Sequence, residues 1–208
     1  MDLLLVRHGV TQYNTDRVFM GHDPVPLSGV GRDQVERLAE RLSFDPPTRI
    51  ISSDILRARQ SAEIIAAKLD LPFQAYAGLR EVDVGSAKGV SYDEAAERWP
   101  KIFLPEGEER FPGGESFAEV ADRAVDFLRS VISEEPDRIL AVTHGGVVRG
   151  VTARLLRLPL SCVADFVIDN ASLTVFRAET DLIQLVTWND TAHLGPARTG
   201  GGWPGVGG

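Results

Sequence analysis

Two of the four histidines in this 208-residue chain stand at equivalent places in the sequence. His8 follows the apolar run 3–6 with one residue between them, and His144 follows the apolar run 139–142 in the same way. Each is followed by glycine, which lets the backbone turn tightly and bring its N–H groups close to a ligand. An imidazole in such a place can serve as a nucleophile, a general acid–base or a metal ligand.

Arginine side chains accompany these histidines. Arg7 directly precedes His8, and Arg57 lies at the start of a predicted helix that follows a predicted strand. A guanidinium group is the natural bidentate partner of phosphate oxygens, and Asn14 adds a neutral donor. Arg59 lies two positions after Arg57, so we expect it to point away into solvent. The set predicts a pocket built for a dianion.

Such a pocket suits phosphoryl transfer to a histidine nitrogen. The neighbouring cations disfavour the imidazolium form of His8, so its neutral form keeps a free lone pair. Arg7, Arg57 and His144 can stabilise the charge on the equatorial phosphoryl oxygens. Glu81 is the best-placed acid for the leaving alkoxide, although its position alone favours a solvated surface carboxylate.

A zinc site is the main competing interpretation of the two histidines. The chain has no HxxxH or HxxEH spacing, and no cluster of cysteine or aspartate stands beside either histidine. We therefore expect neither a metal nor another cofactor.

The elements that must position these residues follow from the apolar patterns. Apolar residues at helical spacing predict helices over 29–42, with Ser28 as N-cap, and over 55–69, 117–132 and 147–156. Apolar runs predict strands over 1–7, 49–53, 138–142, 166–168, 173–176 and 182–186. Strands that are apolar throughout, alternating with helices, indicate an α/β sheet covered by helices on both faces. Ligands of such sheets bind outside the carboxyl ends of the strands, where His8 and His144 lie.

The chain is expected to form one domain over residues 1–194. Residues 77–114 carry no long periodic element, and we predict a lid or substrate-binding insertion there. Residues 195–208 hold seven of the twenty glycines, which predicts a flexible tail.

Composition and charge exclude several classes of protein. The 22 basic and 30 acidic residues give a net charge of −8, which argues against broad binding of nucleic acid or of an anionic membrane. The single cysteine, Cys162, excludes an internal disulfide framework. No apolar stretch approaches the roughly 20 residues of a membrane helix, and the amino terminus does not look like a signal peptide. A cytoplasmic location is therefore the expectation.

The motifs together resemble the histidine phosphatase superfamily, whose fold is phosphoglycerate mutase-like. Seven segments match in the order of the family: Arg7-His8-Gly9 with Thr11 and Asn14, 27–31, 52–62, 79–82 with Gly85, 113–116, 143–146 and 170–172. The likeness runs from residue 1 to about residue 193, nearly the whole predicted domain.

This resemblance implies a three-layer fold with a mixed, mostly parallel sheet flanked by helices on both faces. It also implies that His8 becomes phosphorylated without a metal, and that Arg7, Arg57 and His144 form the phosphate pocket. Asn14 would assist them, and Glu81 would be the proton donor.

The chain departs from its relatives in two places. Many relatives carry a Trp-Glu pair before the glycine that follows Gly85, whereas this chain has Lys88 before Gly89. The segment after Glu81 also lacks the insertion of the glycolytic mutases, which favours a phosphatase that admits water.

We expect the substrate to be a small phosphorylated metabolite, bound by Gly145, His22 and Lys88 beyond the phosphate pocket. Two alternatives remain open: a phosphoglycerate mutase, and an inactive module that only binds a phosphorylated ligand. The expected assembly is a monomer or a homodimer.

Overall fold

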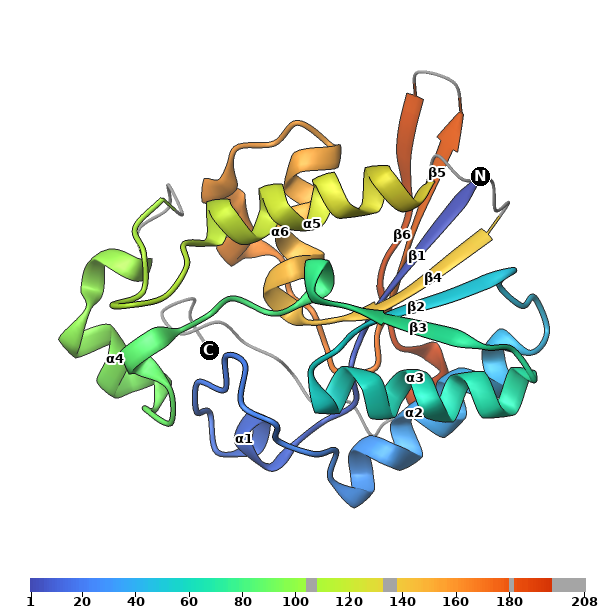
Figure 1. Ribbon diagram of the computed structural model, residues 1–208, viewed down its shortest axis with the longest axis horizontal. Coiled ribbons are helices and arrows are strands. Elements are labelled where there is room, and N and C mark those ends of the chain that lie inside the picture. Colours follow the sequence, from blue (N-terminus) through green and yellow to red (C-terminus); the bar gives the residue numbers. More distant parts are fainter. Residues whose placement is uncertain (104–107, 133–137, 180–181, 196–208) are drawn as a thin grey trace.

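A six-stranded mixed sheet forms the centre of the protein (Figure 1). The structure is a computed structural model, and it describes residues 1–103, 108–132, 138–179 and 182–195. Across the sheet the strands are β3 (Phe73–Tyr76), β2 (Arg49–Ser53), β4 (Arg138–Thr143), β1 (Asp2–Arg7), β5 (Leu173–Glu179) and β6 (Leu182–Asp190). The first four are parallel, whereas β5 runs antiparallel to β1, and β6 antiparallel to β5. The predicted mixed, mostly parallel sheet is confirmed.

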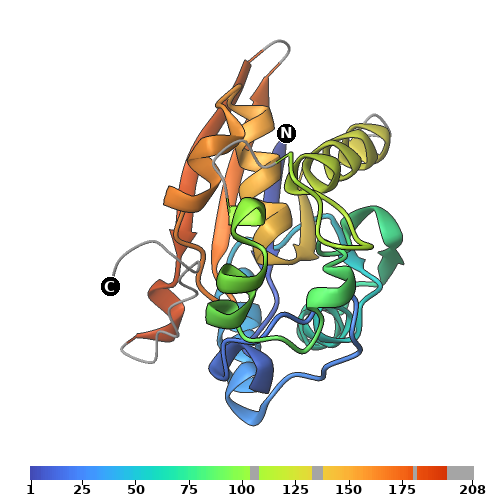
Figure 2. The ribbon, with the colours of Figure 1, turned by 90° about the vertical axis from the view of Figure 1, so that its left-hand side faces the viewer.

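Helices cover both faces of this sheet (Figures 1 and 2). On one face lie α2 (Gly29–Leu42) and α3 (Leu56–Leu69), and on the other lie α5 (Phe117–Ile132) and α6 (Gly145–Leu155). Ser28 caps α2 by accepting a hydrogen bond from the Gly31 N–H at 3.1 Å, as predicted. The three-layer architecture follows from this arrangement.

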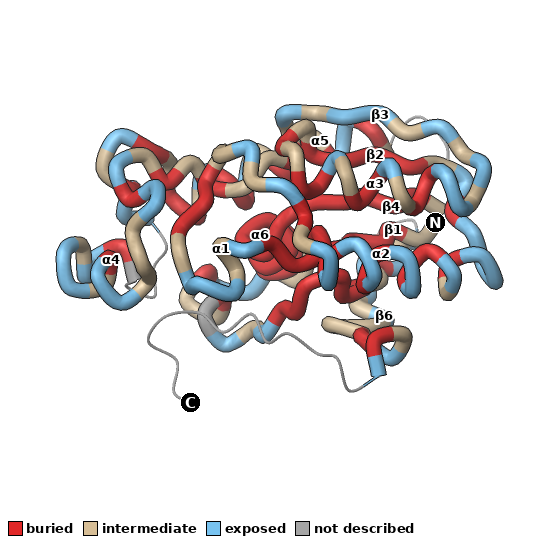
Figure 3. The backbone as a smooth tube through the Cα atoms, turned by 90° about the horizontal axis from the view of Figure 1, so that it is seen from below, coloured by how far each residue is buried: buried red, intermediate tan, exposed pale blue. Residues whose placement is uncertain are grey.

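The apolar runs of the strands are continuous because both faces are buried, as the red strands in Figure 3 show. Successive side chains of a strand point to opposite faces. The core cluster on the side of α2 and α3 takes Leu4, Val6, Ile50, Leu140 and Val142. The cluster on the side of α5 and α6 takes Leu3, Leu5, Ile51, Ile139 and Ala141.

One predicted strand is wrong. Residues 166–168 follow a 3₁₀ helix (Leu160–Asp165) and pair with no strand. Two of their carbonyl groups accept hydrogen bonds from arginine side chains instead. Arg149 Nε donates to the Phe166 carbonyl at 2.7 Å, and Arg7 Nη1 donates to the Ile168 carbonyl at 2.6 Å. The sequence interpretation missed the edge strand β3 and the short helix α1 (Gln12–Thr15).

The segment predicted as a lid projects from the body of the sheet (Figure 1). Within 77–103 and 108–114 it contains α4 (Tyr92–Arg98) and 3₁₀ helices at Ala77–Leu79, Gly85–Ala87 and Pro100–Phe103. Backbone hydrogen bonds between Phe19 and residues 89 and 90 tie it to the loop after α1. The predicted tail begins at residue 195, and its residues 196–208 lie outside the described ones.

None of the helices among the described residues has the length and apolar character needed to span a membrane.

Candidate active site

Parallel pairing of β1 with β4 brings the two strand-end histidines together. Arg7 pairs in register with Thr143, and the His8 N–H donates to the Thr143 carbonyl at 2.9 Å. The rings of His8 and His144 consequently meet edge to face, with centroids 5.2 Å apart. The predicted convergence of the two histidines at one sheet edge is confirmed.

The hydrogen bonds of His8 determine where its proton sits. Nδ1 lies 2.7 Å from the Gly9 carbonyl, and Nε2 lies 3.1 Å from Nε of Arg57. A carbonyl only accepts and a guanidinium only donates, so Nδ1 carries the hydrogen and Nε2 keeps its lone pair. Burial, followed by the charges of Arg57 and Arg7, holds the pKa of His8 well below its usual range. The predicted neutral form is supported, although burial contributes more than the cations.

Arg57 is completely buried in the first turn of α3. Besides His8, its guanidinium donates to the carbonyls of Gly21 at 2.9 Å and Asp23 at 3.2 Å. Burial lowers its pKa to about 10, which leaves it charged at neutral pH. The loop around Gly21 therefore fixes the guanidinium against the histidine.

Arg7 approaches the same histidine from the end of β1. Its Nη1 donates to Ile168, while its buried Nε has no hydrogen-bond partner among the described residues. Burying a polar N–H without a partner is costly, so this nitrogen indicates a place for a ligand acceptor.

His144 lies beside His8 as the N-cap residue of α6, fully buried. Its Nε2 is 2.8 Å from Ser53 Oγ, and its buried Nδ1 has no partner in the described part of the chain. Burial, then the charge of Arg57, holds the pKa of His144 well below its usual range. His144 does not itself line the cavity in front of His8, which is described below.

Two asparagines border His8 on the other side. Asn170 Nδ2 donates to the His8 carbonyl at 3.1 Å and to Asn14 Oδ1 at 3.3 Å. Asn14 Oδ1 also accepts from the Thr11 N–H at 3.0 Å. Asn14 therefore lies beside His8 as predicted, and its amide oxygen accepts hydrogen bonds from Thr11 and Asn170.

Glu81 faces the histidine pocket and is not a solvated surface residue. Its Oε1 accepts from the Val82 N–H at 3.0 Å and its Oε2 from the Gly146 N–H at 3.1 Å. A Cβ at position 146 would lie 2.4 Å from Glu81 Oε1, so only glycine allows this approach. The second glycine of the His144 motif makes room for the carboxylate.

Gly9 plays a different part from the one predicted. Its N–H donates to Ser61 Oγ at 3.2 Å, which leaves no donor for a ligand. A Cβ there would lie 2.3 Å from the Gly31 carbonyl oxygen, so this glycine allows the segment after β1 to pack against the start of α2. Gly145, the predicted substrate-binding glycine, lines the cavity in front of His8.

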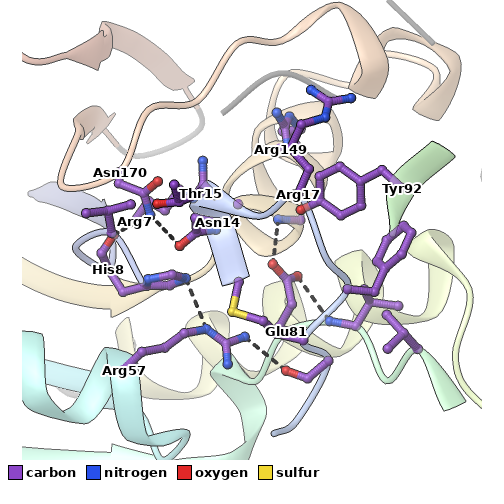
Figure 4. A pocket seen from close by; sticks show the side chains of 18 of the residues that line it. Arg7, His8, Asn14, Thr15, Arg17, Arg57, Glu81, Tyr92, Arg149 and Asn170 are labelled. Carbon is purple, nitrogen blue, oxygen red and sulfur yellow. Dashed lines mark hydrogen bonds between the residues drawn. The ribbon is translucent and has the colours of Figure 1, made fainter. Parts of the chain in front are cut away.

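A cavity of about 320 Å³ opens in front of these groups (Figure 4). Its polar lining comes from strand ends at one edge of the sheet, from α1, α3 and α6 and from the lid: Arg7, His8, Asn14, Thr15, Arg17, Arg57, Glu81, Tyr92, Arg149 and Asn170. No group of three or more His, Cys, Asp or Glu side chains in the described ranges is placed to hold a metal ion.

Two predicted substrate contacts do not reach this cavity. His22 lines a separate cavity beside Asp54, and its Nε2 lies 2.8 Å from the Glu81 carbonyl oxygen. Lys88 is 57% exposed and pairs with Asp23 at 2.5 Å, Nζ to Oδ1. His22 and Asp23, the partner of Lys88, both lie in the loop that contains Gly21, and this placement is not visible in the residue order.

Among the residues of the polar lining that escaped the sequence interpretation, three carry a guanidinium or phenol group: Arg149, Tyr92 and Arg17. Arg149 lies four positions after Gly145 in α6, a spacing that places both on one helix face and could have indicated it. Tyr92 begins α4, and Arg17 follows α1 with a φ of 56°. No local pattern distinguishes Tyr92 or Arg17 from surface residues.

The arrangement presents an unprotonated imidazole nitrogen, several guanidinium groups and one carboxylate to the same cavity. Such a set can bind a phosphoryl group, accept it on nitrogen and move a proton at the leaving oxygen.

Comparison with known proteins finds phosphatases and phosphoglycerate mutase-like proteins as relatives. The family model described as histidine phosphatase superfamily (branch 1) matches residues 3–191. Phosphoglycerate mutase-like protein 4 of Arabidopsis thaliana is 35% identical over 202 residues, 93% of this chain and 86% of that protein. The metal-independent phosphoserine phosphatase of the same plant is 33% identical over 201 residues, 93% of this chain and 83% of its own. Among solved structures, a mycobacterial glucosyl-3-phosphoglycerate phosphatase in complex with VO3 superimposes with a TM-score of 0.83 at 30% identity, covering 90% of this chain and 98% of that one.

Proposed function

The chain belongs to the histidine phosphatase superfamily, and from that premise we propose that it hydrolyses a small phosphomonoester through a phosphohistidine on His8. The observation that carries this proposal is the lone pair of His8 Nε2, held unprotonated at a cavity lined by arginines. Two points support metal independence. The proposed nucleophile is a protein side chain, His8, and one relative is named a metal-independent phosphoserine phosphatase.

In the first step, the phosphoryl group enters between Arg7, Arg57 and His8. Arg57 exchanges its hydrogen bond with Nε2 for one with a phosphoryl oxygen, and Nε2 attacks phosphorus in line with the leaving oxygen. A P–N bond forms while the ester P–O bond breaks. Arg7 and Arg57 stabilise the charge on the equatorial oxygens, and His144 supports His8 from the side.

Glu81 moves the proton in both steps. Its carboxyl group protonates the departing alkoxide, which becomes the free alcohol. The resulting carboxylate then takes a proton from water as the water oxygen attacks phosphorus. The P–N bond breaks, its electron pair returns to Nε2, and inorganic phosphate leaves. Hydrogen bonds from Gly146 and Val82 hold the carboxylate at this place.

A phosphoglycerate mutase is the second candidate, favoured by the name of the Arabidopsis mutase-like relative. A mutase returns the phosphoryl group from histidine to an alcohol, whereas a phosphatase transfers it to water. Following phosphate release and isomerisation of phosphoglycerate in one reaction separates the two. The phosphatase proposal is supported by the short segment that follows Glu81 and by the open cavity.

The decisive experiment traps the phosphorylated protein. Incubation with a ³²P-labelled phosphomonoester and rapid denaturation at alkaline pH is expected to leave acid-labile label on His8. H8A should carry no label and show no turnover, whereas His193→Gln, a change outside the cavity, should keep both. Ligand binding without any label in the wild-type protein would instead support an inactive binding module.

The cytoplasmic location and the monomeric or homodimeric state stay predictions.

A further inference from the structure

The segment that carries Glu81 is held by side chains from other elements. It consists of a 3₁₀ turn followed by an irregular stretch, and α5 packs against the turn (Figure 1). Side chains donate to each carbonyl of residues 77–81. Thr143 Oγ1 donates to the Leu79 carbonyl at 2.8 Å, and His22 Nε2 lies 2.8 Å from the Glu81 carbonyl oxygen. The place of Glu81 therefore depends on donors from distant parts of the chain.

Arg123 of α5 supplies most of these hydrogen bonds. Its Nη1 donates to the carbonyls of Ala77 at 3.2 Å, Gly78 at 3.0 Å and Arg80 at 3.2 Å. Its Nη2 donates to Arg80 at 3.2 Å as well, and to the Glu81 carbonyl at 3.5 Å. A guanidinium group carries five N–H donors in a fixed planar arrangement, so one side chain can hold several carbonyls at once.

Glu115 extends this hold to the other side of Glu81. Its carboxylate accepts from Arg123 Nε at 3.2 Å and from Nη2 at 3.1 Å, which makes a two-point ion pair. Glu115 Oε2 also accepts from the Asp83 N–H at 3.0 Å, and the Glu115 N–H donates to the Asp83 carbonyl at 2.8 Å. The chain is thus tied to the pair of Arg123 and Glu115 both before and after Glu81.

This pair acts on the cavity only through Glu81. Neither Arg123 nor Glu115 is among the described residues that line the cavity. The Glu81 carboxyl oxygens accept from the N–H groups of Val82 and Gly146. Val82 belongs to the held segment, so a shift of that segment would carry the carboxyl group away from Gly146. A misplacement of about 1 Å can cost on the order of 100-fold in rate.

We propose that Arg123, paired with Glu115, is a positioning residue that holds Glu81 at the leaving oxygen without touching the substrate. This inference rests on the proposed phosphatase function, in which Glu81 protonates that oxygen.

Two aryl esters of similar shape, phenyl phosphate and 4-nitrophenyl phosphate, separate positioning from a loss of stability. Phenol is a weaker acid than 4-nitrophenol, so departure of phenolate depends more on a donated proton. We expect R123M to lower kcat/KM for phenyl phosphate at least about tenfold more than for 4-nitrophenyl phosphate. A smaller fraction of folded enzyme lowers both values equally and leaves their ratio unchanged.

Further variants test whether Arg123 acts through Glu81. E81Q should show the same selective loss, and adding R123M to E81Q should change the ratio of the two esters no further. R123K keeps the charge and one donor group, so it should recover part of the loss. E115Q weakens the ion pair but keeps an acceptor for Asp83, and it should shift the ratio in the same direction even where R123M does not fold.

Arg154 provides a matched control. It donates to the carboxylate of Asp122, the neighbour of Arg123 on α5, through Nε at 2.7 Å and Nη2 at 3.1 Å. R154M thus removes a two-point ion pair of α5 that is separate from the hydrogen bonds to the Glu81 segment. It should keep the wild-type ratio of the two esters. Thermal unfolding of each variant reports on its folded state.

Each outcome has a distinct meaning. Equal losses with both esters in R123M and E115Q, while E81Q discriminates between them, would overturn the positioning role and leave the phosphatase function standing. A further change of the ratio when R123M is added to E81Q would also overturn it, because Arg123 would then act by another route. Absence of phosphate release from both esters in the wild-type protein, without label on His8, would instead reject the proposed function itself.

Discussion

Nε of Arg57 lies 3.1 Å from Nε2 of His8, in the position that an incoming phosphorus atom would have to approach. The guanidinium N–H thus donates to Nε2, the proposed nucleophile, which keeps its lone pair. Carbonyls of Gly21 and Asp23 hold the other two guanidinium nitrogens. These contacts join Arg57, in the first turn of α3, and His8, after β1, into one unit of the proposed active site.

Replacing Arg57 by lysine tests this unit. Lysine keeps the positive charge, but it lacks the planar guanidinium group that donates to three acceptors at once. We expect R57K to lower kcat/KM at least about 100-fold. The free energy of unfolding should also fall by about 1–3 kcal/mol, because buried carbonyls lose their donors. Steady-state kinetics and urea unfolding measure both effects, with R59K as the exposed control. A kcat/KM within about threefold of wild type would contradict the assignment.

Acid should destabilise the folded protein through its buried histidines. The unfolded chain protonates His8 and His144 near pH 6.5, whereas burial keeps both neutral in the folded state at much lower pH. The unfolded state then binds more protons, so the free energy of unfolding is fully retained above about pH 6.5 and falls as the pH drops below it. Each histidine contributes up to about 1.4 kcal/mol per pH unit.

Urea unfolding of wild-type protein and H8Q between pH 7.5 and 5 measures this contribution. The carboxylates titrate in both proteins, so the difference between the two slopes isolates His8. Equal slopes would show that His8 titrates normally in the folded protein.

The role of Glu81 predicts a dependence on the leaving group. In E81Q, an alkyl phosphate should be hydrolysed far more slowly because its alkoxide needs a proton to leave. Release of 4-nitrophenolate needs no such proton, so 4-nitrophenyl phosphate should still phosphorylate His8. Water attack lacks its base, and rapid-quench kinetics should therefore show a burst of nitrophenolate followed by slow turnover. An equal loss with both esters would argue against proton transfer by Glu81.

Gly146 should be required for activity more than for stability. A methyl group at this position would lie 2.4 Å from Glu81 Oε1 and push the carboxylate away. Since the obstructed atom ends a flexible side chain, the fold can adapt. We expect G146A to lower kcat at least about tenfold. Its thermal unfolding should stay close to that of G29A, a control whose methyl group meets no atom within 4 Å. A wild-type kcat in G146A would show that Glu81 need not lie there.

Lys88 should be dispensable for substrate binding. Its ammonium group pairs with Asp23 at the surface and does not line the cavity. K88A is expected to keep kcat and KM and to change the free energy of unfolding by less than about 1 kcal/mol. A raised KM in K88A would place the side chain against the substrate after all.

The elements around the site could be predicted from local patterns. The runs before His8 and His144 are apolar throughout because helices bury both faces of their strands, and parallel strands end at the same edge. Helix α2 followed from its Ser28 cap and its apolar face. Residues 166–168 look like a strand by the same rule, yet their carbonyls accept hydrogen bonds from Arg7 and Arg149.

The sequence by itself determined that two histidines and two arginines follow or flank strand ends at one edge of a parallel sheet, since apolar periodicity is a local property and the carboxyl ends of parallel strands share an edge. Only the tertiary structure decided which loop positions face them. It placed Glu81 against the first turn of α6, brought Arg149 into the cavity and kept Lys88 outside. The physical reason is that these contacts depend on where distant carbonyl and N–H groups lie, such as those of Gly21, Gly146 and Phe166, which no single segment encodes.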